Sequence, residues 1–118
     1  MLLNLFLHIV LFLLPLQFRP AISDYLYELP AGKLELNEEP RETAIRELRE
    51  ETGYEAGKLT YLWEFYTSPG YCNEKIHLFL GENLVEVDAE PEPGEFIEKI
   101  EVPIEDLMKM VQRGEIID

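Results

Sequence analysis

The chain has 118 residues, of which 47% are hydrophobic and 29% are charged, so it has the size and composition of one compact domain and falls outside the disordered class. Its formal net charge of −14 argues against duplex DNA or RNA as a partner, because nucleic-acid binding needs Lys and Arg side chains that neutralise phosphates. The only cysteine, Cys72, excludes an internal disulfide and a thiolate zinc cluster, and it favours a reducing cytoplasm.

An almost wholly apolar run occupies Met1 to Phe18, interrupted only at Asn4, His8, Pro15 and Gln17. A buried strand, a membrane anchor and a signal peptide are the interpretations of such a run. Its short length and Pro15 argue against the anchor, and the lack of Lys or Arg before Arg19 argues against the signal. We therefore favour a strand over Leu11 to Phe18, do not expect a membrane partner, and leave residues 1–11 unassigned.

A strand, a turn and a helix are predicted next. Asp24 to Leu29 mixes Tyr and Leu with polar residues, which is typical of a strand, and Pro30-Ala31-Gly32 predicts the turn that ends it. Lys33 to Leu36 is the candidate for a second short strand. Proline is favoured at the first position of a helix and glycine after its last, so a helix is expected from Pro40 to Gly53. Residues at helical spacing predict its core face, namely Ala44, Ile45, Leu48 and Thr52.

The remaining chain alternates strand and turn signals and then ends in a helix. Leu59 to Thr67 and Ile76 to Leu80 predict a hairpin, since Ser68-Pro69-Gly70 between them is typical of a turn. The later elements are an acidic loop over Asp88 to Glu95, a strand over Phe96 to Val102 and an amphipathic helix over Ile104 to Gln112. No linker interrupts the pattern, so residues 1–118 are expected to form one mixed α/β domain.

Three carboxylates share one face of the predicted helix. Residues three and four apart lie on the same side of a helix, so Glu47, Glu50 and Glu51 can converge on one point. Like charges this close repel one another unless a cation compensates them. Oxygen ligands suit a hard ion such as Mg²⁺ or Mn²⁺, and the backbone carbonyl of Ala31 would add a ligand. The alternative is a solvated helix with weak surface ion pairs.

Arg46 and two glycines accompany the carboxylates. The planar guanidinium of Arg46 is predicted to hold Glu carboxylates in position. Gly32 and Gly53 are expected to permit tight backbone turns before the helix and at its end. Together these residues form the pattern Gly-x5-Glu-x7-Arg-Glu-Leu-x-Glu-Glu-x-Gly-Tyr from Gly32 to Tyr54.

This pattern matches the Nudix box at every defining position, so the chain resembles the Nudix hydrolase superfamily. The resemblance implies an α/β/α sandwich around a mixed sheet, and hydrolysis of a nucleoside diphosphate linked to another moiety. It implies that Glu47 and Glu51 are the principal metal ligands, supported by Glu50 and the Ala31 carbonyl. We also count Glu50 and Arg46 among the catalytic residues.

Two further segments, Phe18-Arg19-Pro20 and Tyr27 to Lys33, resemble the ADP-ribose pyrophosphatase branch. The resemblance implies that Arg19 and Glu28 bind substrate, although a structural ion pair is the alternative for Arg19. It implies the same for Pro69, because a proline fifteen residues beyond the box marks the ADP-sugar branch, although a plain turn also explains it.

The acidic loop completes the expected site. In the branch that the chain resembles, a glutamate of this loop acts as the base or as an extra metal ligand. Glu95 is our first choice and Glu92 the runner-up, while a merely solvated loop is the alternative.

The implied reaction cleaves the diphosphate of ADP-ribose, with Mg²⁺ or Mn²⁺, into AMP and ribose 5-phosphate. The alternatives are another nucleotide substrate, or a non-catalytic or truncated nucleotide-binding domain. Relative to the family, an N-terminal β-rich dimerisation segment and the end of the closing helix are expected to be missing, and a homodimer is considered as the assembly. A small nucleoside diphosphate sugar is the expected partner.

Overall fold

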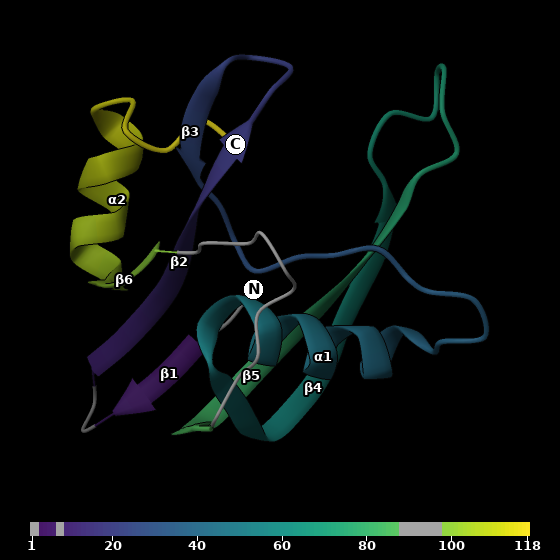
Figure 1. Cartoon of the computed structure of the whole chain (residues 1–118). Helices are drawn as coiled ribbons and strands as arrows, with labels where there is room; N and C mark the ends of the chain where they lie inside the picture. The colour runs from purple at the N-terminus through teal and green to yellow at the C-terminus, as the bar shows by residue number, and fades with distance from the viewer. Residues whose placement is uncertain (1–2, 7–8, 88–97) are drawn as a thin grey trace.

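The computed structural model describes the backbone of residues 3–6, 9–87 and 98–118, and the side chains of residues 14–87 and 100–118. This part of the chain forms six strands and two helices, whose arrangement is drawn in Figure 1. Their bounds are β1 Leu3–Phe6, β2 Ile9–Arg19, β3 Asp24–Tyr27, α1 Pro40–Thr52, β4 Tyr54–Tyr66, β5 Lys75–Glu86, β6 Glu98–Pro103 and α2 Ile104–Gln112.

Strand β2 organises one sheet and the β4–β5 hairpin forms a second. β1 and β3 pair with opposite ends of β2, and β6 pairs with its middle, from Leu11 to Leu16. Every pair among the described strands is antiparallel. β1 also contacts β5, which brings the two sheets together. The expected mixed α/β architecture is confirmed, and a short turn joins the antiparallel pair β2–β3.

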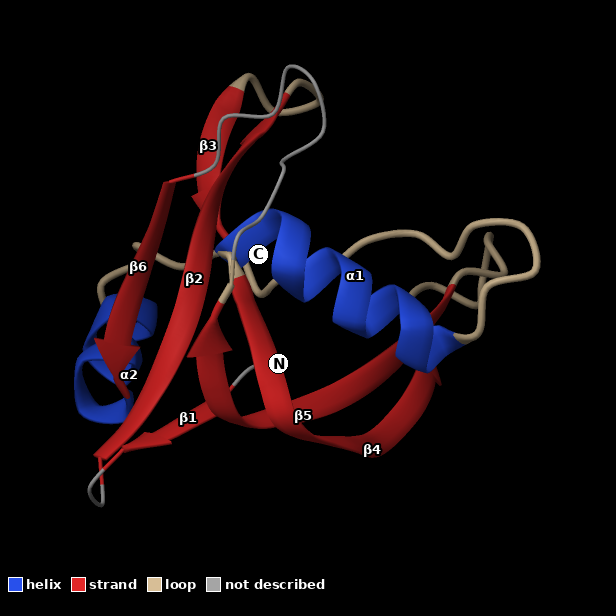
Figure 2. Ribbon diagram, turned by 60° about the horizontal axis from the view of Figure 1, so that its bottom comes forward, coloured by secondary structure: helices blue, strands red, loops and turns tan. Residues whose placement is uncertain are grey.

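The two helices lie on opposite sides of β2 (Figure 2). α1 packs against β2 and the β4–β5 hairpin, whereas α2 packs against β2 and β6. The buried hydrophobic side chains come from both sheets and from α1: Leu14, Leu48, Phe79 and Val102. Burial of a side chain of this size stabilises the fold by about 1.5–3 kcal/mol. Helix α1 is therefore held in place by both sheets.

The N-terminal apolar run forms a strand, as predicted for Leu11 to Phe18. Leu14 and Pro15 are buried within it, while Phe18 is half exposed near its end. Pro15 cannot donate to a ladder, yet its carbonyl oxygen accepts the Glu28 N–H at 3.0 Å. In the described part of the chain, no helix has both the length and the apolar character needed to cross a membrane.

The predicted bounds of α1 are confirmed. Pro40 occupies its first turn, the Glu42 carboxylate accepts the Glu39 N–H at 3.2 Å, and the helix ends at Gly53, whose φ of 74° is left-handed. Two members of the predicted core face, Leu48 and Thr52, are buried. The prediction was wrong for Ile45, which is 46% exposed, because α1 buries Thr43, two residues earlier, instead.

The second short strand predicted over Lys33 to Leu36 is absent, and residues 31–35 form no regular element. The Lys33 carbonyl accepts a hydrogen bond from Arg46, and the Glu35 N–H donates to the Glu38 carboxylate. These backbone groups bond to side chains, so they form no strand ladder. The segment is instead attached to α1 through the Arg46 side chain.

The other elements differ from the prediction mainly at their ends. β3 stops at Tyr27, and the hairpin strands begin earlier or end later than expected because their ladder runs from the Tyr54–Glu86 pair to the Tyr66–Lys75 pair. The bounds of α2 are confirmed. The whole of the predicted acidic loop, Asp88 to Glu95, and the start of the strand predicted from Phe96 lie outside the described residues.

Candidate active site

The guanidinium of Arg46 donates hydrogen bonds to three carboxylates. Its Nε and Nη2 each donate a 2.9 Å hydrogen bond to Glu38. Its Nη1 donates to Glu47 at 2.7 Å and to Glu50 at 3.3 Å, and Nη2 also donates to the Lys33 carbonyl oxygen at 3.1 Å. The predicted contacts between Arg46 and neighbouring Glu side chains are therefore present, and one cation joins the preceding loop to α1.

Glu38 is the most strongly bonded partner of Arg46. The Thr43 hydroxyl donates to the same carboxylate at 2.6 Å, as does the Glu35 N–H at 3.0 Å. Arg46 first, and then these two donors, lower the pKa of the Glu38 carboxyl to about 2. The Glu38 carboxylate in turn raises the pKa of the Arg46 guanidinium. The pair stays ionised throughout the neutral range and fixes the guanidinium in place.

Gly32 provides space for the Glu47 side chain. A β-carbon at position 32 would lie 2.0 Å from Glu47 Cδ and 2.1 Å from its Oε1, far inside contact distance. Gly32 was expected to permit a tight turn, but its φ is not in the left-handed region. The reason for glycine here is steric: the carboxyl end of Glu47 lies directly against the backbone of the loop. For Gly53, the expected turn geometry is confirmed.

Glu51 contacts the same loop one residue earlier, at Ala31. Its side chain is 8% exposed, and its Oε2 accepts the Ala31 N–H at 3.1 Å. Its Oε1 faces the side-chain amide of Gln17 on β2, whose Nε2 lies 3.5 Å away. Glu51 thus contacts Ala31, and Glu47 lies against Gly32. The Ala31 carbonyl belongs to the peptide bond that joins these two residues.

The oxygen atoms of Glu47, Glu50, Glu51 and the Ala31 carbonyl are of the type that binds a hard divalent cation. In the described part of the chain, no three acidic, His or Cys side chains already surround one point. However, Glu47 and Glu50 both reach a single positive nitrogen of Arg46, and Glu51 is held one peptide away. All of these donors are oxygens, the ligand type that Mg²⁺ and Mn²⁺ prefer. A metal that drew the carboxylates together would compete with Arg46 for Glu47 and Glu50.

The two predicted substrate-binding residues Arg19 and Glu28 are brought together. Arg19 Nε donates to Glu28 Oε2 at 2.7 Å, and its Nη2 donates to the other carboxylate oxygen. Glu28 is 6% exposed whereas the Arg19 side chain is 52% exposed. The buried carboxylate therefore orients an arginine that remains open to solvent.

The other predicted site residues are not joined to this cluster. Pro69 is exposed in the loop between β4 and β5, which extends away from the C-terminal end of α1 in both views (Figures 1 and 2). Glu92 and Glu95 lie outside the described residues. Their roles therefore stay predictions.

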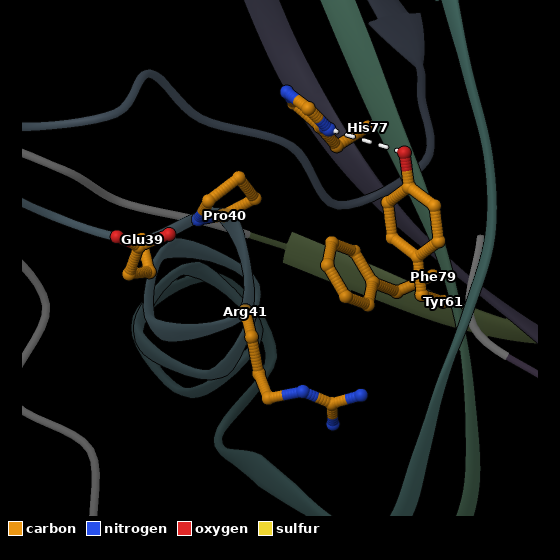
Figure 3. A pocket seen from close by; sticks show the side chains of 6 residues that line it. All are labelled: Glu39, Pro40, Arg41, Tyr61, His77 and Phe79. Atoms are coloured by element: carbon orange, nitrogen blue, oxygen red, sulfur yellow. Dashed lines mark hydrogen bonds between the residues drawn. The ribbon is translucent and has the colours of Figure 1, made fainter.

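A hollow of about 300 Å³ lies at the N-terminal end of α1, between this helix and the β4–β5 hairpin (Figure 3). It is lined by Glu39, Pro40, Arg41, Tyr61, His77 and Phe79. The Tyr61 hydroxyl lies 3.4 Å from His77 Nδ1 and donates to Glu64 at 3.0 Å, which lowers the pKa of the Glu64 carboxyl. None of the lining residues is a predicted metal ligand, so the hollow is separate from the carboxylate cluster.

A comparison with protein families identifies the family to which this helix and loop belong. The NUDIX domain model matches residues 12–117, which include α1, the Arg46 cluster and the loop at Ala31. The chain belongs to the Nudix family. Its α1 is the Nudix helix, and the pattern from Gly32 to Tyr54 is the Nudix box.

Several relatives are named as pyrophosphatases of sugar-linked nucleotides. The chain is 50% identical over 104 residues to the ADP-ribose pyrophosphatase of Bacillus subtilis strain 168, covering 86% of this chain and 56% of that protein. It is 40% identical over 99 residues to GDP-mannose pyrophosphatases of Escherichia coli, covering 81% of this chain and 51% of theirs. A methanol dehydrogenase activator of Bacillus methanolicus is 39% identical, with 86% and 56% covered. The chain thus spans about half the length of these curated relatives.

A solved structure confirms the Nudix fold. The crystal structure of an ADP compounds hydrolase matches with a TM-score of 0.80, covering 95% of this chain and 60% of that one. Only 22% of the aligned residues are identical, so the likeness concerns the fold alone. The predicted fold class is therefore confirmed.

The structure adds three residues that the sequence analysis had not assigned to the site. Glu38 and Thr43 fix Arg46, and Gln17 faces Glu51 from another element. Glu38 belongs to the box, so its spacing was a usable signal. Gln17 had no such signal except its polarity within an apolar strand, because it meets Glu51 across 34 residues of sequence.

Proposed function

We propose that the chain hydrolyses the diphosphate of ADP-ribose or a closely related nucleoside diphosphate sugar, giving AMP and a sugar phosphate. The observation that carries this proposal is the Nudix helix, on which Arg46 holds Glu47 and Glu50 while Glu51 is held at the adjacent loop. The 50% identity to a protein named ADP-ribose pyrophosphatase supports the choice of substrate. GDP-mannose is the second candidate, because relatives with that name are 40% identical.

Mg²⁺ is the proposed cofactor, with Mn²⁺ as the alternative. Glu47, Glu50, Glu51 and the Ala31 carbonyl would hold it, and Glu95 is the proposed extra ligand. When bound, such an ion neutralises the diphosphate and lowers the pKa of a bound water. The oxygen donors described above support this choice, and so does the excess of negative charge on the chain.

The chain's own residues position the reactants and take up a proton. Water attacks one phosphorus, its oxygen stays on that phosphate, and the bridging oxygen leaves with the other phosphate. The proton released by the water passes to Glu95, or to Glu92 as the runner-up. Arg46 and Glu50 are the catalytic residues proposed on the helix, where Arg46 keeps the carboxylates from turning away.

Substrate contacts are proposed on β2 and at the hairpin loop. Arg19 uses its Nε and Nη2 for Glu28, and the other donors of this half-exposed guanidinium would bind a phosphate. Glu28 would orient Arg19, and Pro69 would line the side of the site toward the nucleoside. The ion pair between Arg19 and buried Glu28 supports the first two roles.

A homodimer of one-domain protomers, residues 1–118, is proposed as the assembly. Along α2, apolar side chains at helical spacing are exposed by 43% at Ile104, 52% at Met108 and 47% at Val111. An exposed apolar stripe favours association. Light scattering coupled to gel filtration tests it: a mass near 13.8 kDa rather than twice that value would contradict the dimer.

A cytoplasmic location is proposed from the cysteine content. The lone Cys72 is exposed and free, as suits a reducing compartment. Cell fractionation tests this, and recovery of the chain in a membrane or secreted fraction would contradict it.

Chromatography of the products of ADP-ribose hydrolysis tests the activity. The purified chain with Mg²⁺ should release AMP and ribose 5-phosphate in equal amounts, and Glu51→Gln should lose most of this release under identical conditions. GDP-mannose and other nucleotides are assayed beside it to rank substrates. If the folded chain binds Mg²⁺ and cleaves none of them, a nucleotide-binding role replaces the enzymatic one.

A further inference from the structure

Glu51 depends on residues from two other elements for its orientation. Glu51 is 8% exposed, so its carboxylate oxygens need partners in place of water. The loop supplies the Ala31 N–H to Oε2 at 3.1 Å. Strand β2 supplies the Gln17 amide to Oε1 at 3.5 Å. The two donors approach different oxygens, so together they define the plane of the carboxylate.

Strand β2 holds Gln17 rigidly. The backbone of Gln17 pairs with Leu26 of β3, next to the pair between Phe18 and Tyr25. Side chains alternate along a strand, so Gln17 lies on the same face of β2 as Arg19, two residues further on. The face of β2 that meets Glu51 therefore also carries the arginine that Glu28 orients.

The chemistry of the amide decides which end of Gln17 faces Glu51. The amide NH₂ donates to a carboxylate, whereas the amide oxygen would repel it. A distance of 3.5 Å is at the long end of hydrogen bonding, so this contact contributes less than an ordinary one. Its effect is on orientation: the Gln17 amide is the contact that strand β2 makes with Oε1, and its removal takes that contact from the carboxylate.

We infer that Gln17 is a positioning residue that orients Glu51 for divalent-metal binding. The inference rests on the proposed role of Glu51 as a metal ligand. Partners that orient metal ligands typically alter metal affinity by ten- to a hundredfold when removed. The long contact sets the expected effect lower, at about three- to tenfold in the dissociation constant.

Binding of Mn²⁺ alone, followed by electron paramagnetic resonance without nucleotide, tests the inference. Gln17→Met removes the amide and keeps the length of the side chain. Gln112→Met makes the same chemical change at an exposed position of α2 and is the matched control. Mn²⁺ affinity should fall about three- to tenfold in Gln17→Met and stay unchanged in Gln112→Met. Equal affinities in the two variants would overturn the inference.

A double-mutant cycle separates positioning from a general loss of structure. If Gln17 acts through Glu51, Gln17→Met should have no further effect on Mn²⁺ affinity in the Glu51→Gln background. An equal loss in both backgrounds would overturn the inference. Gln17→Asn keeps an amide but shortens the reach by one methylene, so it should weaken binding too, with a urea midpoint closer to the parent.

The proposed function fails separately from this inference. If Glu51→Gln leaves Mn²⁺ affinity unchanged, Glu51 is not a ligand and the proposed metal site is wrong. If Glu51→Gln weakens binding but neither Gln17 variant does, only the positioning role is overturned. In Gln17→Met, the Mg²⁺ concentration for half-maximal ADP-ribose hydrolysis should rise together with the Mn²⁺ dissociation constant. The KM for ADP-ribose at saturating metal should stay equal to that of the parent.

Discussion

Replacement of Gly32 by alanine should disable the proposed metal site while leaving the fold largely intact. The new β-carbon would lie 2.0 Å from Glu47 Cδ, and ordinary contact begins at 3.4 Å, so the carboxyl end must move by about 1.4 Å. The Arg46–Glu47 hydrogen bond of 2.7 Å cannot survive this displacement in its present geometry. Since the clashing atoms are the far end of a flexible side chain, the backbone can stay in place.

Two different magnitudes follow from this displacement. A hydrogen bond between charged groups that are partly open to solvent contributes about 1–2 kcal/mol to stability. A misplacement of about 1 Å in a catalytic site costs roughly a hundredfold in rate. Gly32→Ala should therefore lower the free energy of unfolding by about 1–2 kcal/mol and lower kcat for ADP-ribose by about a hundredfold.

Urea unfolding and steady-state kinetics measure these two effects on one preparation. Gly70→Ala is the steric control, because a β-carbon at position 70 meets nothing within 4 Å. It should match the parent in both assays. The reasoning is refuted if Gly32→Ala keeps kcat within about twofold of the parent, or if it loses more than about 4 kcal/mol of stability, which would indicate a backbone role instead.

Three further outcomes follow from the contacts of α1. The pKa of Glu38 lies below its unfolded value, so its ionised form stabilises the fold above about pH 4.5, and this contribution is lost as the pH falls toward about 2. Glu38→Gln should therefore be less stable than the parent at pH 6, and urea unfolding should show this difference shrinking between pH 4.5 and pH 2; a constant difference would contradict the ion pair. Arg46→Lys keeps the charge but cannot reach Glu38, Glu47 and Glu50 at once, so stability should fall by about 1–3 kcal/mol and kcat by at least tenfold. A kcat equal to that of the parent would show that the simultaneous hydrogen bonds of the Arg46 guanidinium are not needed. Leu48→Ala truncates a side chain that is 3% exposed and should cost about 2–5 kcal/mol in urea unfolding. A cost below about 1 kcal/mol would show that α1 is not anchored through this residue.

Local patterns were sufficient for the helices and for the existence of most strands. Pro40 and Gly53 mark the ends of α1 through their own backbone preferences, and α2 shows the apolar spacing of an amphipathic helix. The β4–β5 hairpin was predicted in the right place but too short. Its outer residues pair because the partner strand continues beside them, and that information is not local.

The wrong assignments have a common cause in contacts made by side chains. Lys33 to Leu36 looks like a strand, yet Arg46 and Glu38 occupy its backbone groups. Ile45 was expected in the core, but α1 is rotated so that Thr43 is buried and can donate to Glu38. Hydrophobic periodicity alone does not register such polar contacts.

The sequence by itself determined the family chemistry: the spacing of Glu47, Glu50 and Glu51 on a helix, the adjacent arginine, and the oxygen donors suited to a hard cation. These features depend on residues within one helix, where geometry follows from spacing. Only the tertiary structure decided why position 32 is glycine and which residue faces Glu51 from β2. Those contacts join segments 15 and 34 residues apart, and their geometry is set by how the loop and the strand pack against α1.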